Sequence, residues 1–126
     1  MLSEKDKRHL AIAQGWFDLG LPLDANDELE LIDARLRAHP DVLDIRWRIY
    51  AIEDKFDDTL TIVRTILKLR PDRSPEICYD LACHACRLNR LTEARSFLGR
   101  ALEGSGSEMK LRALRDQRLE RIWRQQ

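Results

Sequence analysis

The sequence predicts an all-α chain, and three observations support that prediction. Apolar residues recur at three- and four-residue steps along most of the chain, which is the signature of a helix face. Only five of the 126 residues are glycine and four are proline, and no alternating run long enough for a strand occurs. Charged residues make up 35% of the chain and apolar residues 44%, which suits packed helices with solvated faces. A chain of this length is expected to form one domain, residues 1–126.

A first helix hairpin is predicted over residues 5–39. Its opening helix, 5–19, is expected to end at Gly20, because glycine readily adopts the left-handed conformation that stops a helix. Asp24 or Asn26 is expected to cap the second helix through its side-chain oxygen. The apolar face of this second helix is predicted to be Leu29, Leu31, Ile32, Ala34 and Leu36.

Two more hairpins are predicted, over residues 41–70 and 75–103. Each combines two apolar helical segments with a short polar connection. Asn89 lies between the two helices of the last hairpin, and we expect it to adopt the left-handed conformation there.

A C-terminal helix is predicted over residues 108–125, with Ser105 or Ser107 as its cap. Its apolar side is expected to consist of Met109, Leu111, Leu114, Leu119, Ile122 and Trp123. Arginine recurs every third residue along it, at Arg112, Arg115, Arg118, Arg121 and Arg124. On an α-helix this spacing drifts by about 60° per step, so a single basic stripe is not expected.

The three hairpins show an internal repeat. An offset of 34 residues aligns the opening helices of the first two hairpins, so that Trp16 matches Tyr50 and Gly20 matches Asp54. An offset of 35 aligns the second hairpin with the third, so that Tyr50 matches Ala85. The second helices of the first two hairpins align best at 31, which predicts about three extra residues in the first turn.

The third hairpin resembles a tetratricopeptide repeat (TPR). The family places large and small residues in a set order, and Leu81, Ala82, Leu91, Ala94, Leu98 and Ala101 occupy those positions. The first two hairpins are degenerate in this respect, since Trp47, Thr59 and Ile66 occupy small positions of the second. The resemblance covers residues 6–103. It implies a right-handed superhelical stack of three antiparallel hairpins, and the C-terminal helix looks like the one that closes many bacterial TPR domains.

The resemblance implies a non-catalytic module that binds a protein or peptide partner in a concave groove lined by the first helix of each hairpin. The matching groove positions are Lys7, Leu10, Gln14, Phe17, Asp44, Arg48, Ala51, Ile52, Tyr79, Cys83, Cys86 and Arg87. Leu10, Phe17 and Tyr79 would give apolar contacts to the partner. Arg48 and Arg87 are suited to hold a carboxylate.

Three cysteines, Cys78, Cys83 and Cys86, lie together with His84 in the third hairpin. Their C-x4-C-x2-C spacing matches part of a plant-type iron–sulfur motif, so a metal or redox site is one hypothesis. The fourth cysteine and the glycines of a cluster-binding loop are absent, and a helix directs Cys83 and His84 to different sides. Small thiols packed within a helix are therefore expected, with no cofactor.

Other function classes have little support in the sequence. The three histidines are scattered, and no phosphate-binding loop, HExxH motif or nucleophile elbow occurs, so we do not expect an enzyme. The net charge of zero argues against nucleic-acid binding. The charged N-terminus does not resemble a signal peptide and no apolar run approaches 18 residues, which predicts no membrane association. The odd number of cysteines favours reduced thiols and a cytoplasmic location.

The charge is unevenly distributed along the chain. Residues 21–60 contain eleven acidic and five basic side chains, whereas residues 61–126 contain eight acidic and fourteen basic ones. Solvated helix faces would explain this pattern. A self-assembling structural unit, in which the basic end contacts an acidic face of a second copy, is the alternative function.

Overall fold

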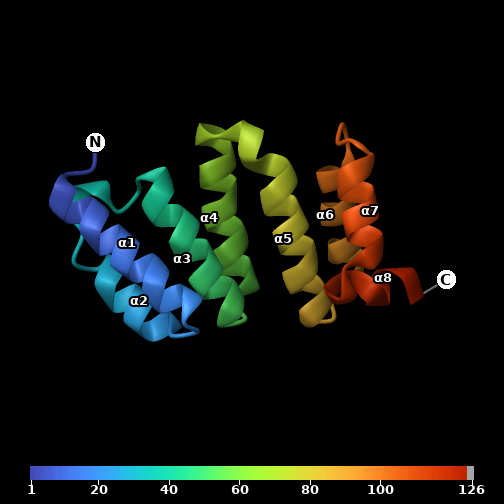
Figure 1. The fold of residues 1–126 in the computed structure, drawn as a ribbon, viewed down its shortest axis with the longest axis horizontal. Coiled ribbons are helices and arrows are strands. Elements are labelled where there is room, and N and C mark those ends of the chain that lie inside the picture. Colours follow the sequence, from blue (N-terminus) through green and yellow to red (C-terminus); the bar gives the residue numbers. More distant parts are fainter. Residues whose placement is uncertain (125–126) are drawn as a thin grey trace. The chain divides into compact units, whose positions relative to one another are not determined.

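The computed structural model describes residues 1–124 and divides the chain into two compact units, Met1–Leu69 and Arg70–Gln126 (Figure 1). The described residues form helices and turns with no strand, which confirms the predicted all-α class. The longest helix has 15 residues, and none within 1–124 is long and apolar enough to span a membrane.

The first unit contains two helix hairpins. Its elements are α1 (Glu4–Asp18), α2 (Pro22–Leu29), the 3-10 turn η1 (Ala34–Leu36), α3 (Pro40–Ile52) and α4 (Phe56–Leu69). Helix α1 packs on α2 and α3 packs on α4, while α1 and α2 both contact α3. The core between the first three helices consists of Leu2, Ala13, Ala25, Leu29, Ile32, Val42, Ile45 and Ile49.

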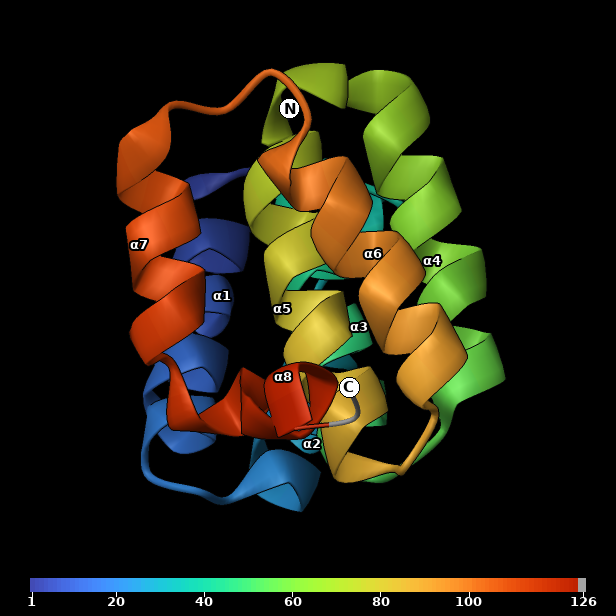
Figure 2. The ribbon, with the colours of Figure 1, turned by 90° about the vertical axis from the view of Figure 1, so that its right-hand side faces the viewer.

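The second unit begins with the third hairpin. Its elements are η2 (Pro71–Arg73), α5 (Ser74–Arg87), α6 (Leu91–Leu102), α7 (Ser107–Arg115), η3 (Gln117–Leu119) and α8 (Glu120–Arg124). Helices α5 and α6 form the hairpin, η3 packs on α5, and α8 packs on α6. Figure 2 shows α8 crossing near the C-terminal end of α5.

The three hairpin turns share one backbone conformation. Gly20, Asp54 and Asn89 have φ angles of 78°, 63° and 61°, the left-handed values that end a helix. The residue after each of them donates its N–H to a carbonyl five residues earlier. These bonds are Leu21 to Trp16 (3.0 Å), Lys55 to Tyr50 (2.9 Å) and Arg90 to Ala85 (2.8 Å). The offsets of 34 and 35 residues predicted for the opening helices are therefore confirmed at the turns.

The second helices keep the same register, so the predicted extra residues in the first turn are wrong. The backbone N–H groups of Ala25, Thr59 and Ala94 close the first turn of α2, α4 and α6, again at offsets of 34 and 35. All three side chains are fully buried. Helix α2 begins at Pro22, because proline suits the first helical position, and neither of the predicted polar caps is used.

The irregularity of the first hairpin lies at the other end of α2. The helix ends at Leu29 instead of continuing to residue 39, and Asp33 caps the 3-10 turn that follows. The Asp33 N–H donates to Asp6 Oδ1 at 3.3 Å, which fixes this turn against the start of α1. Leu31 and Ala34 are consequently exposed, and their predicted place on an apolar helix face is wrong.

The predicted C-terminal helix is also interrupted; residues 125–126 lie outside the described range. Asp116 has an extended backbone with ψ of 113°, and its side chain caps η3 by accepting the Arg118 N–H. The indole N–H of Trp123 then donates to Ala113 O at 3.3 Å, so α8 folds back towards the end of α7. Because of this break, Leu111 and Leu114 are exposed and not part of an apolar side. Neither predicted serine caps α7, which has Gly106 at that position.

Candidate functional site

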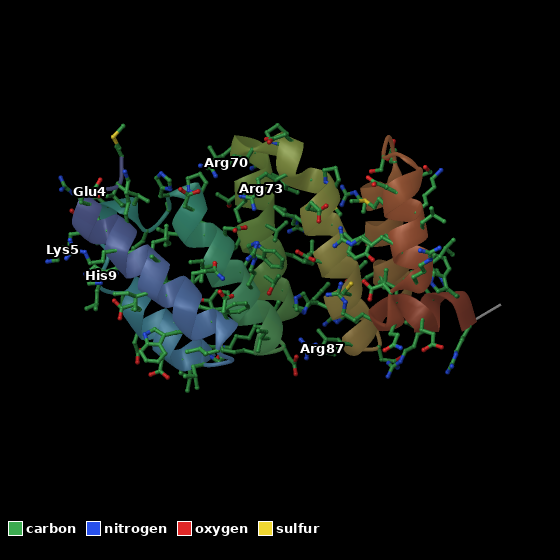
Figure 3. All side chains as sticks on the ribbon, viewed as in Figure 1. Glu4, Lys5, His9, Arg70, Arg73 and Arg87 are labelled. Atoms are coloured by element: carbon green, nitrogen blue, oxygen red, sulfur yellow. The ribbon has the colours of Figure 1, made fainter. Side chains whose placement is uncertain are left out.

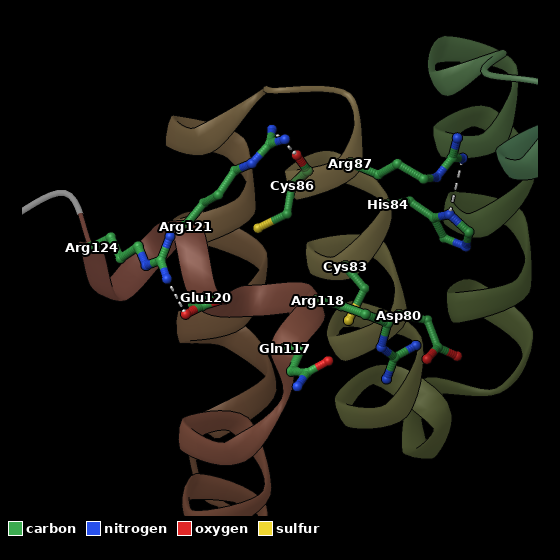
Figure 4. Close-up of a pocket in the computed structure, with 10 residues that line it drawn as sticks. All are labelled: Asp80, Cys83, His84, Cys86, Arg87, Gln117, Arg118, Glu120, Arg121 and Arg124. Atoms are coloured by element: carbon green, nitrogen blue, oxygen red, sulfur yellow. Dashed lines mark hydrogen bonds and ion pairs between the residues drawn. The ribbon is translucent and has the colours of Figure 1, made fainter.

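The second unit contains a pocket of about 440 Å³ (Figure 4). Helix α5 lines one side with Asp80, Cys83, His84, Cys86 and Arg87, and η3 and α8 line the other with Gln117, Arg118, Glu120, Arg121 and Arg124. Four guanidinium groups therefore share this pocket with only two carboxylates. A concave site with convergent charged groups is a natural candidate for ligand binding.

Two of the four arginines are neutralised by neighbouring carboxylates. Arg118 makes a two-point contact with Asp116, at 3.0 Å from Nε and 2.7 Å from Nη2. Arg124 forms a 2.7 Å ion pair with Glu120, one turn away on the same helix. Ion pairs with Asp116 and Glu120 therefore fix the orientation of both guanidinium groups.

Arg121 differs from both. Its Nη1 donates to the Cys86 carbonyl oxygen at 3.2 Å, and among residues 1–124 no carboxylate lies within ion-pair distance of its guanidinium. This carbonyl lies in the last turn of α5, where cations are favoured by the helix dipole, and it also accepts the Asn89 N–H at 3.0 Å. Arg121 therefore brings a full positive charge to the pocket.

Arg87 lies at the C-terminal end of α5 (Figure 3) and is exposed. Its Nη2 is 3.5 Å from His84 Nδ1, so the two side chains lie together on this side of the pocket. The prediction that His84 is directed away from Cys83 is consistent with its partial exposure beside a buried cysteine.

The cysteines behave as small apolar groups. All three are free and buried. Burial raises the pKa of the Cys83 thiol to about 12 and also raises that of Cys86, so both stay protonated at neutral pH. Cys78 Sγ lies 3.7 Å from Ser74 Oγ. Within residues 1–124, no three His, Cys, Asp or Glu side chains converge in a way that could hold a metal ion.

Tyr79 was predicted to contact a partner, but the chain's own C-terminal segment, residues 107–124, contacts it instead. The side chain is fully buried, its hydroxyl donates to Asp116 Oδ2 at 2.8 Å, and the Arg112 guanidinium lies 4.1 Å from its ring centroid. Arg112 is held in turn by Glu76 at 3.3 Å. This segment thus occupies the face of α5 that was expected to remain open.

Electrostatics reinforce the contact between Tyr79 and Asp116. The hydrogen bonds from Arg118, followed by the one from Tyr79, lower the pKa of Asp116 to about 2 against the opposing effect of burial. Burial, together with the bond to Asp116, raises the pKa of Tyr79. The pair therefore consists of a carboxylate and a neutral phenol throughout the physiological pH range.

The first unit has a shallower hollow of about 300 Å³ between α1 and α3. Four residues predicted to line a groove meet there, namely Lys7, Leu10, Gln14 and Asp44. Arg48, predicted to hold a carboxylate of a partner, forms a 3.2 Å ion pair with Asp44 and lies 5.8 Å from the Trp47 ring centroid.

The remaining predicted groove residues are divided between surface and interior. Ile52 is exposed, whereas Phe17 packs partly against the core of the first unit. Ala51 is 1% exposed and therefore cannot line an open surface, which corrects that prediction. Cys83, Cys86 and Arg87 line the pocket of the second unit, although the two thiols are largely buried beneath it.

Sequence reasoning missed the three arginines of η3 and α8. Arg118, Arg121 and Arg124 were expected to diverge around a continuous α-helix. The break at Asp116 instead begins the short 3-10 turn that contains Arg118, and the short helix α8 that follows contains Arg121 and Arg124. The turn places this segment against α5, where all three arginines line the pocket. The signal was Asp116 itself, a residue type that competes with helical hydrogen bonding through its side chain.

A scan of protein-family models found no match to this chain, and searches of curated proteins and of solved structures found none either.

Proposed function

We propose that this chain is a non-catalytic protein-interaction module of the TPR type, which binds a peptide or helix of a partner protein through its opening helices α1 and α3. The observation that carries the proposal is the hairpin turn repeated at offsets of 34 and 35 residues. A helix–turn–helix unit of about 34 residues is the period of that family. Repeated hairpins that stack in series form extended surfaces that suit protein partners.

The hollow between α1 and α3 supports the same proposal. It combines a basic, an apolar, an amide and an acidic side chain from two successive hairpins, at Lys7, Leu10, Gln14 and Asp44. Such a mixture suits a peptide, which offers both backbone polar groups and side chains.

Site-specific cross-linking tests this function. A photoreactive phenylalanine analogue is placed at Lys7 or Ala11, both exposed at the hollow, and at Arg64, an exposed control position on α4. We expect one partner polypeptide to be cross-linked from both hollow positions and not from Arg64. Equal labelling from all three positions would contradict the proposal.

A second variant connects the test to Arg48, the predicted arginine of α3. The substitution Arg48→Glu reverses its charge, and we expect it to weaken recovery of the cross-linked partner. Unchanged recovery would remove this part of α3 from the binding surface.

Self-assembly is the second candidate, and the charges of the two units favour it. Residues 1–69 contain ten basic and fourteen acidic side chains, whereas residues 70–126 contain twelve basic and eight acidic ones. Opposite net charges allow one unit of a molecule to attract the other unit of a second molecule. Light scattering at low and high salt tests this, since such a dimer dissociates when salt screens the charges.

A further inference from the structure

We infer that the pocket between α5 and the η3–α8 segment binds an acidic peptide of a protein partner, with a peptide carboxylate held by Arg121. The inference rests on the proposed function and specifies the chemistry of the partner. It identifies a site separate from the hollow between α1 and α3.

The donors of Arg121 carry the inference. A guanidinium has five N–H donors, and the bond to Cys86 O occupies one nitrogen, Nη1. The side chain is exposed, and the bond to α5 fixes its position at the pocket. An oriented guanidinium with unused N–H groups can bind a carboxylate at two points, with a smaller entropic cost than a mobile side chain.

The neighbouring charges favour a carboxylate over a phosphate group. Asp80 and Glu120 line the same pocket and would repel a dianion more strongly than a single carboxylate. Arg118 and Arg124 are already paired with carboxylates of the chain. A moderate positive potential remains, which suits a singly charged side chain.

The base of the pocket suits the aliphatic part of an acidic side chain. The protonated thiols of Cys83 and Cys86 line it and are almost completely buried. Their low polarity strengthens a nearby ion pair by excluding water. Figure 4 shows these sulfur atoms on the side of α5 that faces η3 and α8.

The test uses a fluorescein-labelled peptide of ten glutamates, with the ten-glutamine peptide as its uncharged counterpart. Fluorescence anisotropy measures binding to the full chain, to Arg121→Gln and to Arg100→Gln, an exposed arginine of α6 outside the pocket. We expect Arg121→Gln to weaken binding of the glutamate peptide roughly tenfold, as the loss of a charge-assisted contact predicts. Arg100→Gln is expected to retain binding within about twofold.

The position of the bound peptide is tested separately, because a fold change in affinity alone does not show which residues the peptide contacts. In the chain with nitrogen-15 arginine, the Arg121 Nε–H resonance is expected to shift on titration with the glutamate peptide. Arg121→Lys keeps the charge without the planar two-point geometry, and we expect intermediate affinity. Circular dichroism confirms that each variant is folded.

Several outcomes would overturn the inference. Equal weakening by Arg121→Gln and Arg100→Gln would indicate general charge attraction, and no binding of the glutamate peptide would remove the site. A peptide with phosphoserine that binds more tightly than the glutamate peptide would assign the pocket to phosphate. In each case a partner cross-linked at Lys7 and Ala11 would leave the proposed function standing, so the two failures are distinguishable.

Discussion

The Tyr79 hydroxyl donates a 2.8 Å hydrogen bond to Asp116, and this contact joins α5 to the point where the C-terminal helix breaks. Asp116 also accepts two bonds from the Arg118 side chain and the backbone N–H of the same residue. One carboxylate therefore holds a buried phenol, caps η3 and orients an arginine of the pocket. The shape of the candidate site depends on this residue.

Replacement of Asp116 by alanine is expected to destabilise the second unit by about 2–3 kcal/mol, because the buried Tyr79 hydroxyl loses its acceptor. Amide hydrogen exchange should accelerate across residues 107–124. The matched control is Arg124→Gln in the same segment, whose exposed ion pair with Glu120 is expected to contribute less than about 0.5 kcal/mol. Equal effects of the two variants would contradict the assigned role of Asp116.

The same carboxylate predicts an acid dependence of stability. The pKa of Asp116 is about 2 in the folded chain, below its ordinary value of 3.8. Its contribution is therefore fully present above about pH 4 and is lost as the pH falls towards 2, where protonation favours the unfolded state. Urea denaturation between these pH values should show a loss of about 1–2 kcal/mol from this group. An Asp116→Asn chain with the same acid dependence would refute this assignment.

Two glycine substitutions in the first hairpin should have opposite effects. Gly20 has a φ of 78°, so Gly20→Ala is expected to cost about 1 kcal/mol of folding free energy. Gly15 lies within α1, and an added Cβ there meets no atom within 4 Å, so Gly15→Ala should stabilise by about 0.5–1 kcal/mol. Thermal denaturation of both variants provides the comparison. A stabilising Gly20→Ala would show that the turn differs from the one described.

Asp6 is a buried carboxylate that joins the start of α1 to the turn after α2. It accepts bonds from the Ser3 hydroxyl and from the backbone N–H groups of Ser3 and Asp33. The hydroxyl bond is the main cause of its lowered pKa. Asp6→Ala is expected to lower the midpoint of urea denaturation, because the capping box at the start of α1 and the turn after α2 both lose an acceptor. Glu4→Gln, an exposed change in the same helix turn, is the control and should leave the midpoint nearly unchanged.

The thiols should resist modification in the folded chain. Cys78, Cys83 and Cys86 are buried, and the raised pKa of Cys83 leaves little thiolate at pH 8. A thiol-reactive disulfide reagent is expected to modify all three in urea and none rapidly without it. An added exposed cysteine, Ser96→Cys on α6, reports the rate of an accessible thiol. Native cysteines that react as fast as this one would contradict their burial.

The sequence predicted the opening helices and their turns well, for a physical reason. The apolar period of α1 and α5 and the left-handed tendency of Gly20 and Asn89 are local properties, visible without knowledge of tertiary contacts. The end of α2 is different, because it depends on a hydrogen bond between Asp33 and Asp6, 27 positions apart in sequence. A local sequence pattern cannot reveal a hydrogen bond between residues so far apart in the chain.

The sequence predicted only part of the candidate site, because the rest of it also comes together through a tertiary contact. Arg87 and the two cysteines of the pocket were named as binding residues only because the TPR resemblance places them at groove positions of α5. The arginines of η3 and α8 face them only because the chain turns at Asp116, and the tertiary contact with Tyr79 stabilises that turn. The assignment to the TPR family and the binding function remain predictions.

The separation of charge between the two units has a practical consequence for handling the protein. A chain with no net charge lacks the mutual repulsion that keeps molecules dispersed, so we expect its colloidal stability near neutral pH to be low. If self-assembly is the function, the acidic residues 1–69 of one molecule would also attract the basic residues 70–126 of another. Turbidity should therefore fall when moderate salt is added, which is the opposite of ordinary salting out.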